Sequence, residues 1–203
     1  MDLIRYLIAL MLIAAVPVAI VFWLLVHPFT AFWRRMGTGK AYTVLFAVLV
    51  AVIATMLALH RSLLVSDFGL NVPLAGVGVL FLLVSGWLLF KLRQKLSLKA
   101  MLGVPELSAE SEKGSLIADG IYAKIRHPRY TQMTLAIFGY ALISNYPAAY
   151  GAFIVWCLGI YAVTVLEERE LECRFGEAYG RYRKRVPRFV PRFGQRHKDN
   201  MQP

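Results

Sequence analysis

Long, uninterrupted apolar stretches dominate the pattern of hydrophobic and polar positions along the chain. Five runs stand out, at residues 6–26, 41–59, 72–90, 130–144 and 147–166. A helix needs ~20 apolar residues to cross the ~30 Å hydrocarbon core of a bilayer. Four runs reach about this length, whereas residues 130–144 form a shorter one. We therefore predict an all-α integral membrane protein with about five transmembrane helices.

The ends of these runs add two further expectations. The apolar part of a signal peptide covers only ~7–15 residues, whereas residues 6–26 contain no charge at all. We therefore expect an uncleaved anchor at this position. Only Asn145, Tyr146 and Pro147 separate the last two runs, which predicts that these runs form a tight antiparallel helical hairpin.

The distribution of basic residues predicts the orientation of the chain in the membrane. There are 23 Lys and Arg residues against 12 Asp and Glu, and the net charge is +11. Cytoplasmic loops of membrane proteins carry an excess of Lys and Arg. With the N-terminus outside, 21 of the 23 basic residues fall on the inner side and only Arg5 and Arg61 on the outer side. This split favours an odd number of spans and a cytoplasmic C-terminus, and it explains the positive charge without nucleic acid.

The chain divides into two parts that differ in chemistry. Residues 1–99 hold three spans with ordinary connections and no recognisable catalytic motif, and His27 at the end of the first span is expected at the interface. Residues 100–203 hold an inner segment, the hairpin and a charged tail; we expect both parts to form one structural unit. Cys157 and Cys173 lack the paired spacing of a zinc site, so no metal is expected.

A basic cluster immediately precedes the fourth apolar run. Arg126, His127 and Arg129 surround Pro128, and proline suits the first turn of a helix. A helix N-terminus attracts anions, and the basic side chains add hydrogen-bond donors at that point. Two interpretations remain open from the residues alone: a collar of snorkelling side chains at a span end, or an anion-binding site.

An acidic cluster follows the fifth run. Glu167 and Glu168 are costly to desolvate at the edge of a span, and the hairpin brings them to the depth of residues 126–129. An interfacial salt-bridge network would explain both clusters. The sharper hypothesis is a site for a zwitterion, whose carboxylate meets the basic end and whose ammonium or sulfonium meets the acidic and aromatic end. Tyr122 and Tyr130 could add cation–π contacts there.

A second helical pattern follows the acidic cluster. Leu171, Phe175, Tyr179 and Tyr182 recur at helical spacing, and basic residues are interleaved with the last of them. This pattern predicts a cytoplasmic amphipathic helix that lies on the inner leaflet.

Together these motifs resemble the isoprenylcysteine carboxyl methyltransferase family and its bacterial relatives. Any one block is weak, but the ordered set, interrupted by a helical hairpin, is specific and covers about residues 113–191. The matching residues are Gly120-Ile121-Tyr122, Arg126-His127-Pro128-Arg129-Tyr130, Glu167-Glu168-Arg169-Glu170-Leu171, Phe175-Gly176, Tyr179, Tyr182, Val186-Pro187 and Pro191.

The resemblance implies a membrane methyltransferase that uses S-adenosylmethionine and acts on a lipophilic or small acceptor at the cytoplasmic membrane face. Its partners would be membrane lipid and that acceptor, and its place a bacterial inner membrane. We assign Arg126 and Glu168 to catalysis by this resemblance. The cofactor-binding residues that we assign in the same way are Gly114, Ser115, Leu116, Ile117, Tyr122, His127, Pro128, Arg129, Tyr130 and Glu167.

Two positions depart from the family pattern. Gln132 stands where the family often has glycine, which would alter contacts with cofactor or substrate. Val163 stands where the eukaryotic prenylcysteine enzymes carry an arginine. The second departure favours another acceptor, such as a phospholipid amine, a small thiol or a quinone-like lipid. Two other functions stay open: an NADPH-dependent membrane reductase of the sterol-reductase type, and a non-catalytic membrane protein that keeps the scaffold.

Overall fold

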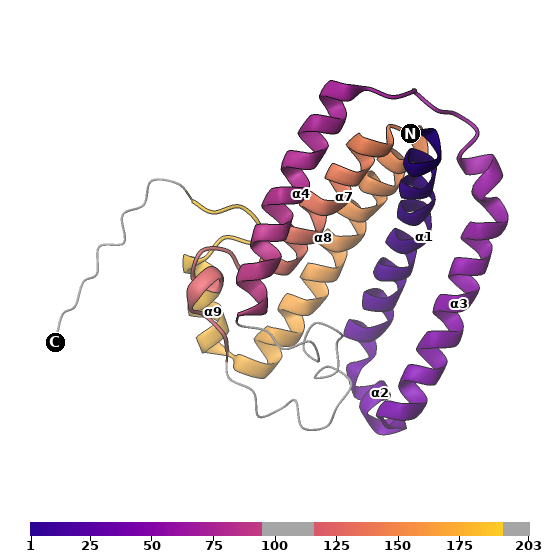
Figure 1. Ribbon diagram of the computed structural model, residues 1–203. Helices are drawn as coiled ribbons and strands as arrows, with labels where there is room; N and C mark the ends of the chain where they lie inside the picture. The colour runs from indigo at the N-terminus through magenta and orange to yellow at the C-terminus, as the bar shows by residue number, and fades with distance from the viewer. Residues whose placement is uncertain (95–115, 193–203) are drawn as a thin grey trace.

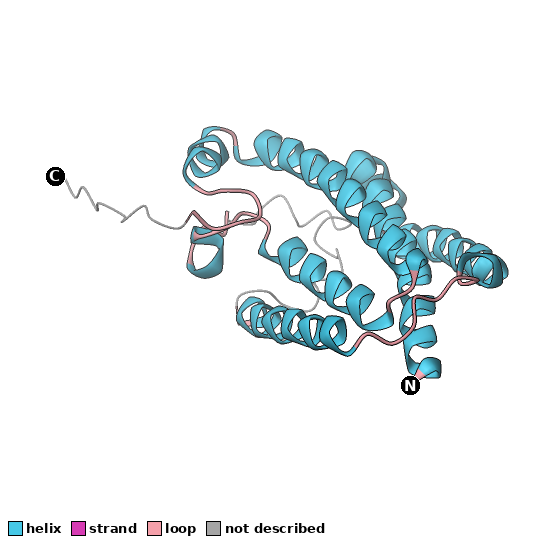
Figure 2. Ribbon diagram, turned by 90° about the horizontal axis from the view of Figure 1, so that it is seen from above, coloured by secondary structure: helices cyan, strands magenta, loops and turns pink. Residues whose placement is uncertain are grey.

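The computed structural model describes residues 1–94 and 116–192, and within these ranges the regular structure is entirely helical (Figures 1 and 2). The predicted all-α fold is therefore confirmed. The long helices are α1 (Asp2–Val26), α3 (Thr38–Leu63), α4 (Val72–Arg93), α7 (Pro128–Ser144) and α8 (Pro147–Phe175). The short elements are η1 (His27–Phe29), α2 (Thr30–Met36), η3 (Gly120–Ala123) and α9 (Glu177–Arg185).

Four segments of the described residues are long and apolar enough to cross a membrane: Asp2–Trp33, Thr38–Leu63, Val72–Arg93 and Pro147–Phe175. They make the chain a multi-pass membrane protein and confirm four of the five predicted spans. The remaining predicted span, at residues 130–144, corresponds to α7. This helix has only 17 residues, or ~25 Å at 1.5 Å per residue. This length falls short of the ~30 Å hydrocarbon core.

The predicted hairpin of α7 and α8 is confirmed. Asn145 ends α7 in the left-handed conformation, with φ of 55°, which asparagine tolerates better than most residues. Pro147 then opens α8 at its first turn, where its missing N–H would be unpaired in any case. The turn lies at the same end of the bundle as the N-terminus and the α3–α4 connection (Figure 1).

The helix α7 of the hairpin also packs closely against α4. A Cβ added to Gly78 of α4 would lie 2.6 Å from the carbonyl oxygen of Gly139 on α7, so the two backbones touch, as small residues allow in membranes. Further along, the Gln132 amide donates to Ser85 Oγ at 2.7 Å, and Ser85 donates to the Gln132 carbonyl at 3.0 Å. Gln132 is therefore a link between two helices, and the expected effect of this position on cofactor or substrate contacts stays a prediction.

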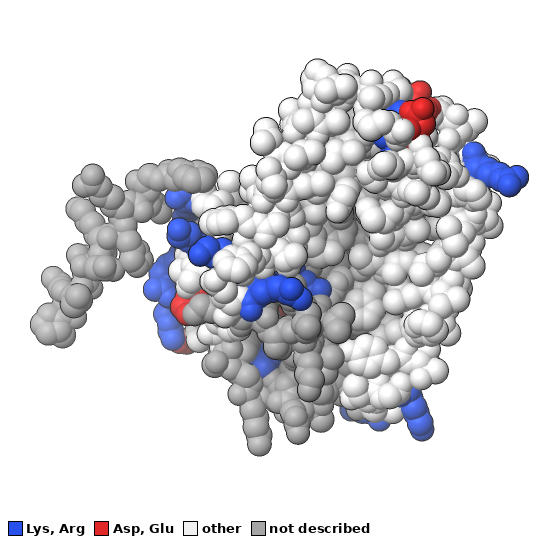
Figure 3. All heavy atoms as spheres, in the orientation of Figure 1, with Lys and Arg blue, Asp and Glu red and all other residues white. Residues whose placement is uncertain are grey.

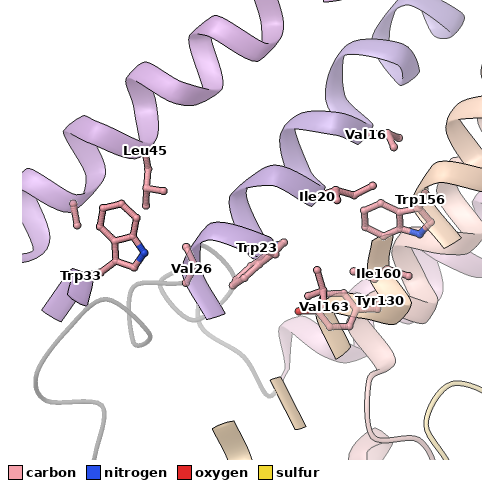
Figure 4. Close-up of a cluster of buried hydrophobic side chains, with 11 residues drawn as sticks. Val16, Ile20, Trp23, Val26, Trp33, Leu45, Tyr130, Trp156, Ile160 and Val163 are labelled. Atoms are coloured by element: carbon pink, nitrogen blue, oxygen red, sulfur yellow. The ribbon is translucent and has the colours of Figure 1, made fainter. Parts of the chain in front are cut away.

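A hydrophobic core extends from α2 and α3 across α1 to α7 and α8 (Figure 4). Trp156 of α8 is completely buried, and its indole N–H donates to Thr134 of α7 at 2.8 Å. Trp23 of α1 and Tyr130 of α7 belong to the same cluster. Helices from the first part of the chain thus pack directly against those from the second.

One end of the bundle is closed by a polar cluster around Arg5, which is only 2% exposed. Its Nε donates to the Ser144 carbonyl at 3.0 Å, its Nη1 to Asp2 at 3.2 Å, and its Nη2 to the Asp67 carboxylate. We call these four residues the Arg5 clasp. The clasp joins the N-terminus, the α3–α4 connection and the α7–α8 turn.

The view in Figure 3 shows how charge is distributed over one face of the molecule. Acidic and basic atoms lie together near the clasp, and a broad band without charged side chains follows. Most of the visible Lys and Arg atoms lie toward the opposite end. This arrangement suits a bundle whose middle faces lipid and whose ends face water.

Candidate functional site

The basic and acidic clusters of the sequence meet at the end of the bundle opposite the Arg5 clasp. Arg126 and His127 lie just before α7, and Glu167 and Glu168 lie in the last third of α8. His127 Nε2 is 3.0 Å from Glu168 Oε1, and its Nδ1 is 3.5 Å from Glu167 Oε2. Arg126 Nη2 is 3.3 Å from Glu168 Oε1. The predicted meeting of the two clusters is confirmed.

The segment after α9, residues 186–192, holds the basic cluster in place; we call it the strap. The backbone N–H of Arg126 donates to the Pro187 carbonyl at 2.9 Å, and that of His127 donates to the Arg188 carbonyl at 3.0 Å. These bonds satisfy two backbone donors just before α7, where a helix leaves its own N–H groups without partners. The strap therefore fixes the position of both basic side chains.

Glu168 is the anchor of the strap. Arg188 donates to its two oxygens from Nε at 3.0 Å and from Nη2 at 2.7 Å, a bidentate pair that is stronger than a single hydrogen bond. Arg126 and His127 occupy the remaining space around the carboxylate, which is only 3% exposed. Glu168 thus balances three cationic groups of the chain itself.

A pocket of about 190 Å³ opens beside this network, between the segment before α7, the end of α8 and α9. It is smaller than the ~300–1,000 Å³ of a typical small-molecule site, so the described part encloses a portion of such a ligand. Its lining residues are Leu116, Ile117, Tyr122, Arg126, His127, Glu167, Leu171, Arg174, Phe175, Tyr179 and Tyr182.

Three residues of the pocket carry buried polar atoms without hydrogen-bond partners among the described residues. These atoms are Nε and Nη1 of Arg126, Oε2 of Glu167 and the hydroxyl of Tyr179. The side chains of Arg126 and Glu167 are 9% and 26% exposed. A buried polar group without a partner costs ~1–3 kcal/mol. A ligand that offers an anion to Arg126 and a cation to Glu167 would remove this cost.

Two aromatic residues of the pocket lining come from α9. Gly176, with φ of 53°, separates α8 from α9, so the chain turns and lays Tyr179 and Tyr182 over the pocket. Both are buried, and Tyr182 donates to the Tyr122 carbonyl at 2.8 Å. The predicted amphipathic helix is confirmed. Its tyrosine face packs on the chain itself, however, and is not the surface that would lie on the inner leaflet.

The surroundings of the pocket shift the pKa values of its titratable groups. Burial raises the pKa of Tyr122 and Tyr179, and it raises the pKa of Tyr182 to about 12. These hydroxyls therefore stay protonated and can donate. Burial by itself would lower the pKa of His127, but the Glu167 and Glu168 carboxylates outweigh burial and raise it. The two carboxylates thus favour the cationic form of His127.

Half of the predicted site residues line the pocket: Leu116, Ile117, Tyr122, Arg126, His127 and Glu167. Glu168 does not line the pocket, because adjacent residues on a helix point ~100° apart and Glu167 faces it. Gly114 and Ser115 lie outside the described residues.

The remaining three predicted residues do not line the pocket. Pro128 is buried in the first turn of α7. The Arg129 guanidinium lies over the Trp23 ring, 5.1 Å from its centroid. Tyr130 belongs to the hydrophobic core and stacks on His127 with ring centroids 5.7 Å apart. These residues contribute to the packing of His127 and of the start of α7.

Several residues at the site were not predicted from the sequence. Arg174 lines the pocket, and Arg188 reaches it through Glu168. His27, which we expected at the interface, is buried; its Nδ1 is 3.1 Å from Glu170 and its ring stacks on Trp23. The first part of the chain therefore reaches the carboxylates of α8. Its position at the end of an apolar run was the only signal that His27 gave.

Comparison with known proteins agrees with this architecture. Residues 74–178, just over half of the chain, match the family model described as phospholipid methyltransferase. The match runs from α4 into α9 and contains both charged clusters. A multi-pass helical membrane protein with this match is of the membrane methyltransferase class. The chain belongs to the phospholipid methyltransferase family, whose members generally use S-adenosylmethionine.

A curated relative supports the same grouping. The chain is 35% identical over 85 residues to protein-S-isoprenylcysteine O-methyltransferase of Schizosaccharomyces pombe. The aligned part covers 37% of this chain and 33% of the relative, so the chain spans about a third of the length of that protein. No solved structure matches the chain significantly. The resemblance to this group of methyltransferases, inferred from the motifs, is confirmed.

Proposed function

We propose that this chain transfers a methyl group from S-adenosylmethionine to a lipophilic or small acceptor at the membrane surface. One observation carries the proposal. Two donors of Arg126 without hydrogen-bond partners among the described residues line the same small pocket as Glu167 Oε2, which forms a 3.5 Å ion pair with His127. Together they match a zwitterion such as the amino-acid part of this cofactor.

The residues of the pocket divide the work of binding between them. Arg126 Nε and Nη1 can donate to a carboxylate, and Glu167 Oε2 can accept from an ammonium group. Hydrogen bonds to charged groups contribute ~1.5–3 kcal/mol each, more than neutral bonds. Tyr122 and Phe175 line the same pocket and can contact a cation through their ring faces.

S-adenosylmethionine supplies a methyl group that its sulfonium already activates. The protein therefore needs to position and enclose the reacting groups, and orientation alone can lower a barrier by several kcal/mol. Glu168 acts in this scheme as a positioning residue, because it holds Arg126, His127 and Arg188 at once. It is thus assigned to positioning instead of the catalytic role that the family resemblance suggested.

We further propose that the pocket end of the bundle faces the cytoplasm and that the Arg5 clasp faces the other side. The excess of basic residues at the pocket end supports this orientation. Cys173 is exposed at the end of α8, so it serves as a native reporter in a Cys157→Ser background. A membrane-impermeant thiol reagent should label Cys173 and an introduced Ser66→Cys from opposite sides. Labelling of both from one side would contradict the orientation.

Calorimetric titration of the purified protein with S-adenosylhomocysteine tests the activity, with NADPH as the alternative ligand. We expect S-adenosylhomocysteine to bind and NADPH not to bind. Arg126→Ala and Glu167→Gln should each weaken binding by about 10–150-fold, which corresponds to ~1.5–3 kcal/mol. Both variants should unfold near the wild-type temperature.

A matched control is Arg181→Ala. Arg181 is a mostly exposed arginine of α9 that pairs with Glu177 at 3.3 Å, and its loss should leave binding unchanged. Wild-type binding by Arg126→Ala and Glu167→Gln would show that the two clusters form only an interfacial salt-bridge network. If the binding losses occur as expected, a screen of lipid extracts with radiolabelled cofactor would identify the acceptor class.

A further inference from the structure

We infer that Tyr179 is a ligand-binding residue whose hydroxyl donates to the same carboxylate that Arg126 binds. This inference rests on the proposed function and adds a subsite to it. The sequence placed Tyr179 only on the apolar face of an amphipathic helix. The pocket shows instead a buried donor without a partner beside two others.

The position of the Tyr179 hydroxyl is set by packing. The residue is 1% exposed and belongs to a small apolar cluster with Tyr182 and Val186. The rings of Tyr179 and Tyr182 are tilted against each other at a centroid distance of 6.0 Å. The hydroxyl nevertheless has no hydrogen-bond partner among the described residues, and its residue lines the pocket.

Other buried or partly buried tyrosines in the structure use their hydroxyl groups. Tyr182, three residues along the same helix, donates to the Tyr122 carbonyl at 2.8 Å. Tyr150, in the hairpin, donates to Asn145 Oδ1 at 2.8 Å. Since a buried hydroxyl without a partner is destabilising, the contrast indicates that the partner of Tyr179 comes from outside the described chain.

The neighbouring charges indicate which end of a zwitterion Tyr179 meets. Tyr179 lines the same pocket as Arg126, and Arg126 Nη2 is 3.3 Å from Glu168 Oε1. Glu168 is already saturated by Arg188, Arg126 and His127. The unmet groups at this corner are therefore donors: two nitrogens of Arg126 and the protonated Tyr179 hydroxyl. A carboxylate, which accepts at both oxygens, is the complement of that set.

The test uses Tyr179→Phe, which keeps the ring and removes only the hydroxyl. Binding is measured by calorimetry with two probes: S-adenosylhomocysteine, and its analogue that lacks the carboxylate but keeps the ammonium group. We expect Tyr179→Phe to weaken binding of S-adenosylhomocysteine about tenfold. Binding of the analogue should stay within about twofold of wild type, because the deleted hydroxyl has no carboxylate to meet.

Tyr150→Phe provides the control, since it removes a partly buried hydroxyl at the opposite end of the bundle. It should bind both probes like wild type. Equal losses for both probes in Tyr179→Phe would overturn the inference, because they would show a packing role. Unchanged binding of S-adenosylhomocysteine would overturn it too, while leaving the proposed function intact.

The wild-type protein offers a second test that does not depend on folding of the variant. It should bind S-adenosylhomocysteine more tightly than the analogue that lacks the carboxylate. Equal affinities would overturn the carboxylate subsite. Failure of the wild-type protein to bind S-adenosylhomocysteine at all would contradict the proposed function itself, and the two failures are thus distinguishable.

Discussion

Two buried arginines lie at opposite ends of the bundle and differ in how many of their nitrogens have hydrogen-bonding or ion-pair partners. Arg5 uses all three of its nitrogens, toward the Ser144 carbonyl and the carboxylates of Asp2 and Asp67. Arg126 uses only Nη2, toward Glu168, and its other two nitrogens are buried without described partners. Burial alone therefore does not separate a structural charge from a functional one.

Saturation of the hydrogen-bonding groups separates the two ends. A buried arginine with a partner at each nitrogen contributes to folding, because each nitrogen that loses water gains a hydrogen bond. A partly paired one lowers the stability of the empty protein and returns that free energy when a ligand binds. Active sites are commonly strained or under-satisfied in this way. The four predictions below test this contrast.

Arg5→Ala should have the largest effect on folding. Removal of one partner from a buried charge network typically costs ~3–5 kcal/mol, and Asp67 would lose its counter-charge. Thermal unfolding in detergent measures the loss, and titration with S-adenosylhomocysteine below the transition should give wild-type affinity. Arg61→Ala, which removes an exposed arginine near the same end, should change neither. Lost affinity with little lost stability in Arg5→Ala would reverse the assignment of the two ends.

Glu168→Gln should destabilise the pocket end by a smaller amount. Arg188, Arg126 and His127 would lose their common anion, and loss of charged hydrogen bonds costs ~1.5–3 kcal/mol. Unfolding curves, together with limited proteolysis after residue 185, report release of the strap. Glu172→Gln, which breaks a half-exposed pair with Arg183, is the control and should matter little. A strap as protected as in wild type would argue against Glu168 as its anchor.

The two ends should respond to opposite directions of pH change. The carboxylates of Glu167 and Glu168 raise the pKa of His127. The contribution of His127 to the free energy of unfolding is therefore complete below pH ~6.5, and it is lost as the pH rises through the folded-state pKa. Burial alone would raise the pKa of Asp67, but hydrogen bonds from Arg5 and Gly69 outweigh burial and lower that pKa. The contribution of Asp67 is complete above ~3.9 and is lost as pH falls through the folded-state value.

Unfolding temperatures measured across pH check this prediction. His127→Gln should flatten the alkaline side of the profile, and Asp67→Asn should flatten the acidic side. An alkaline limb that survives in His127→Gln would show that another group is responsible for it.

Gln132→Ala should have the smallest effect, since Gln132 lies between the two ends. Loss of its hydrogen bond to Ser85 should cost ~0.5–1.5 kcal/mol and leave the affinity for S-adenosylhomocysteine unchanged. Ser85→Ala is the comparison variant and should cost more, because it removes both hydrogen bonds between the two helices. A clear loss of affinity in Gln132→Ala alone would support the expectation that this position contacts the cofactor.

The sequence was sufficient for the helices because their cause is local. An apolar run of ~20 residues has one stable arrangement in lipid, and α1, α3, α4 and α8 follow such runs. The hairpin was equally predictable, because Asn145 and Pro147 stand at its only turn. The meeting of Arg126 with Glu168 followed from that hairpin.

The parts that could not be predicted depend on contacts between distant segments. The spacing from Leu171 to Tyr182 predicts one continuous helical face, but Gly176 breaks the helix and folds the two halves onto each other. Arg188 follows the last helix with no periodic signal. Its backbone bond to His127 and the position of its guanidinium over the Tyr161 ring aim it at Glu168. His27 reaches the site because α1 packs against α8, which no pattern within either helix encodes.

The strap also has a consequence for the order in which the protein assembles during synthesis. The Arg5 clasp is complete once Ser144 has been made, whereas the pocket end requires Arg188, which follows Glu168 by 20 residues. At ~5–20 residues per second, the delay between Ser144 and Arg188 is on the order of 2–9 s. During this interval a nascent chain holds a clasped bundle without a closed pocket. Ribosome-bound chains stopped before the strap should therefore be membrane-inserted yet unable to retain S-adenosylhomocysteine.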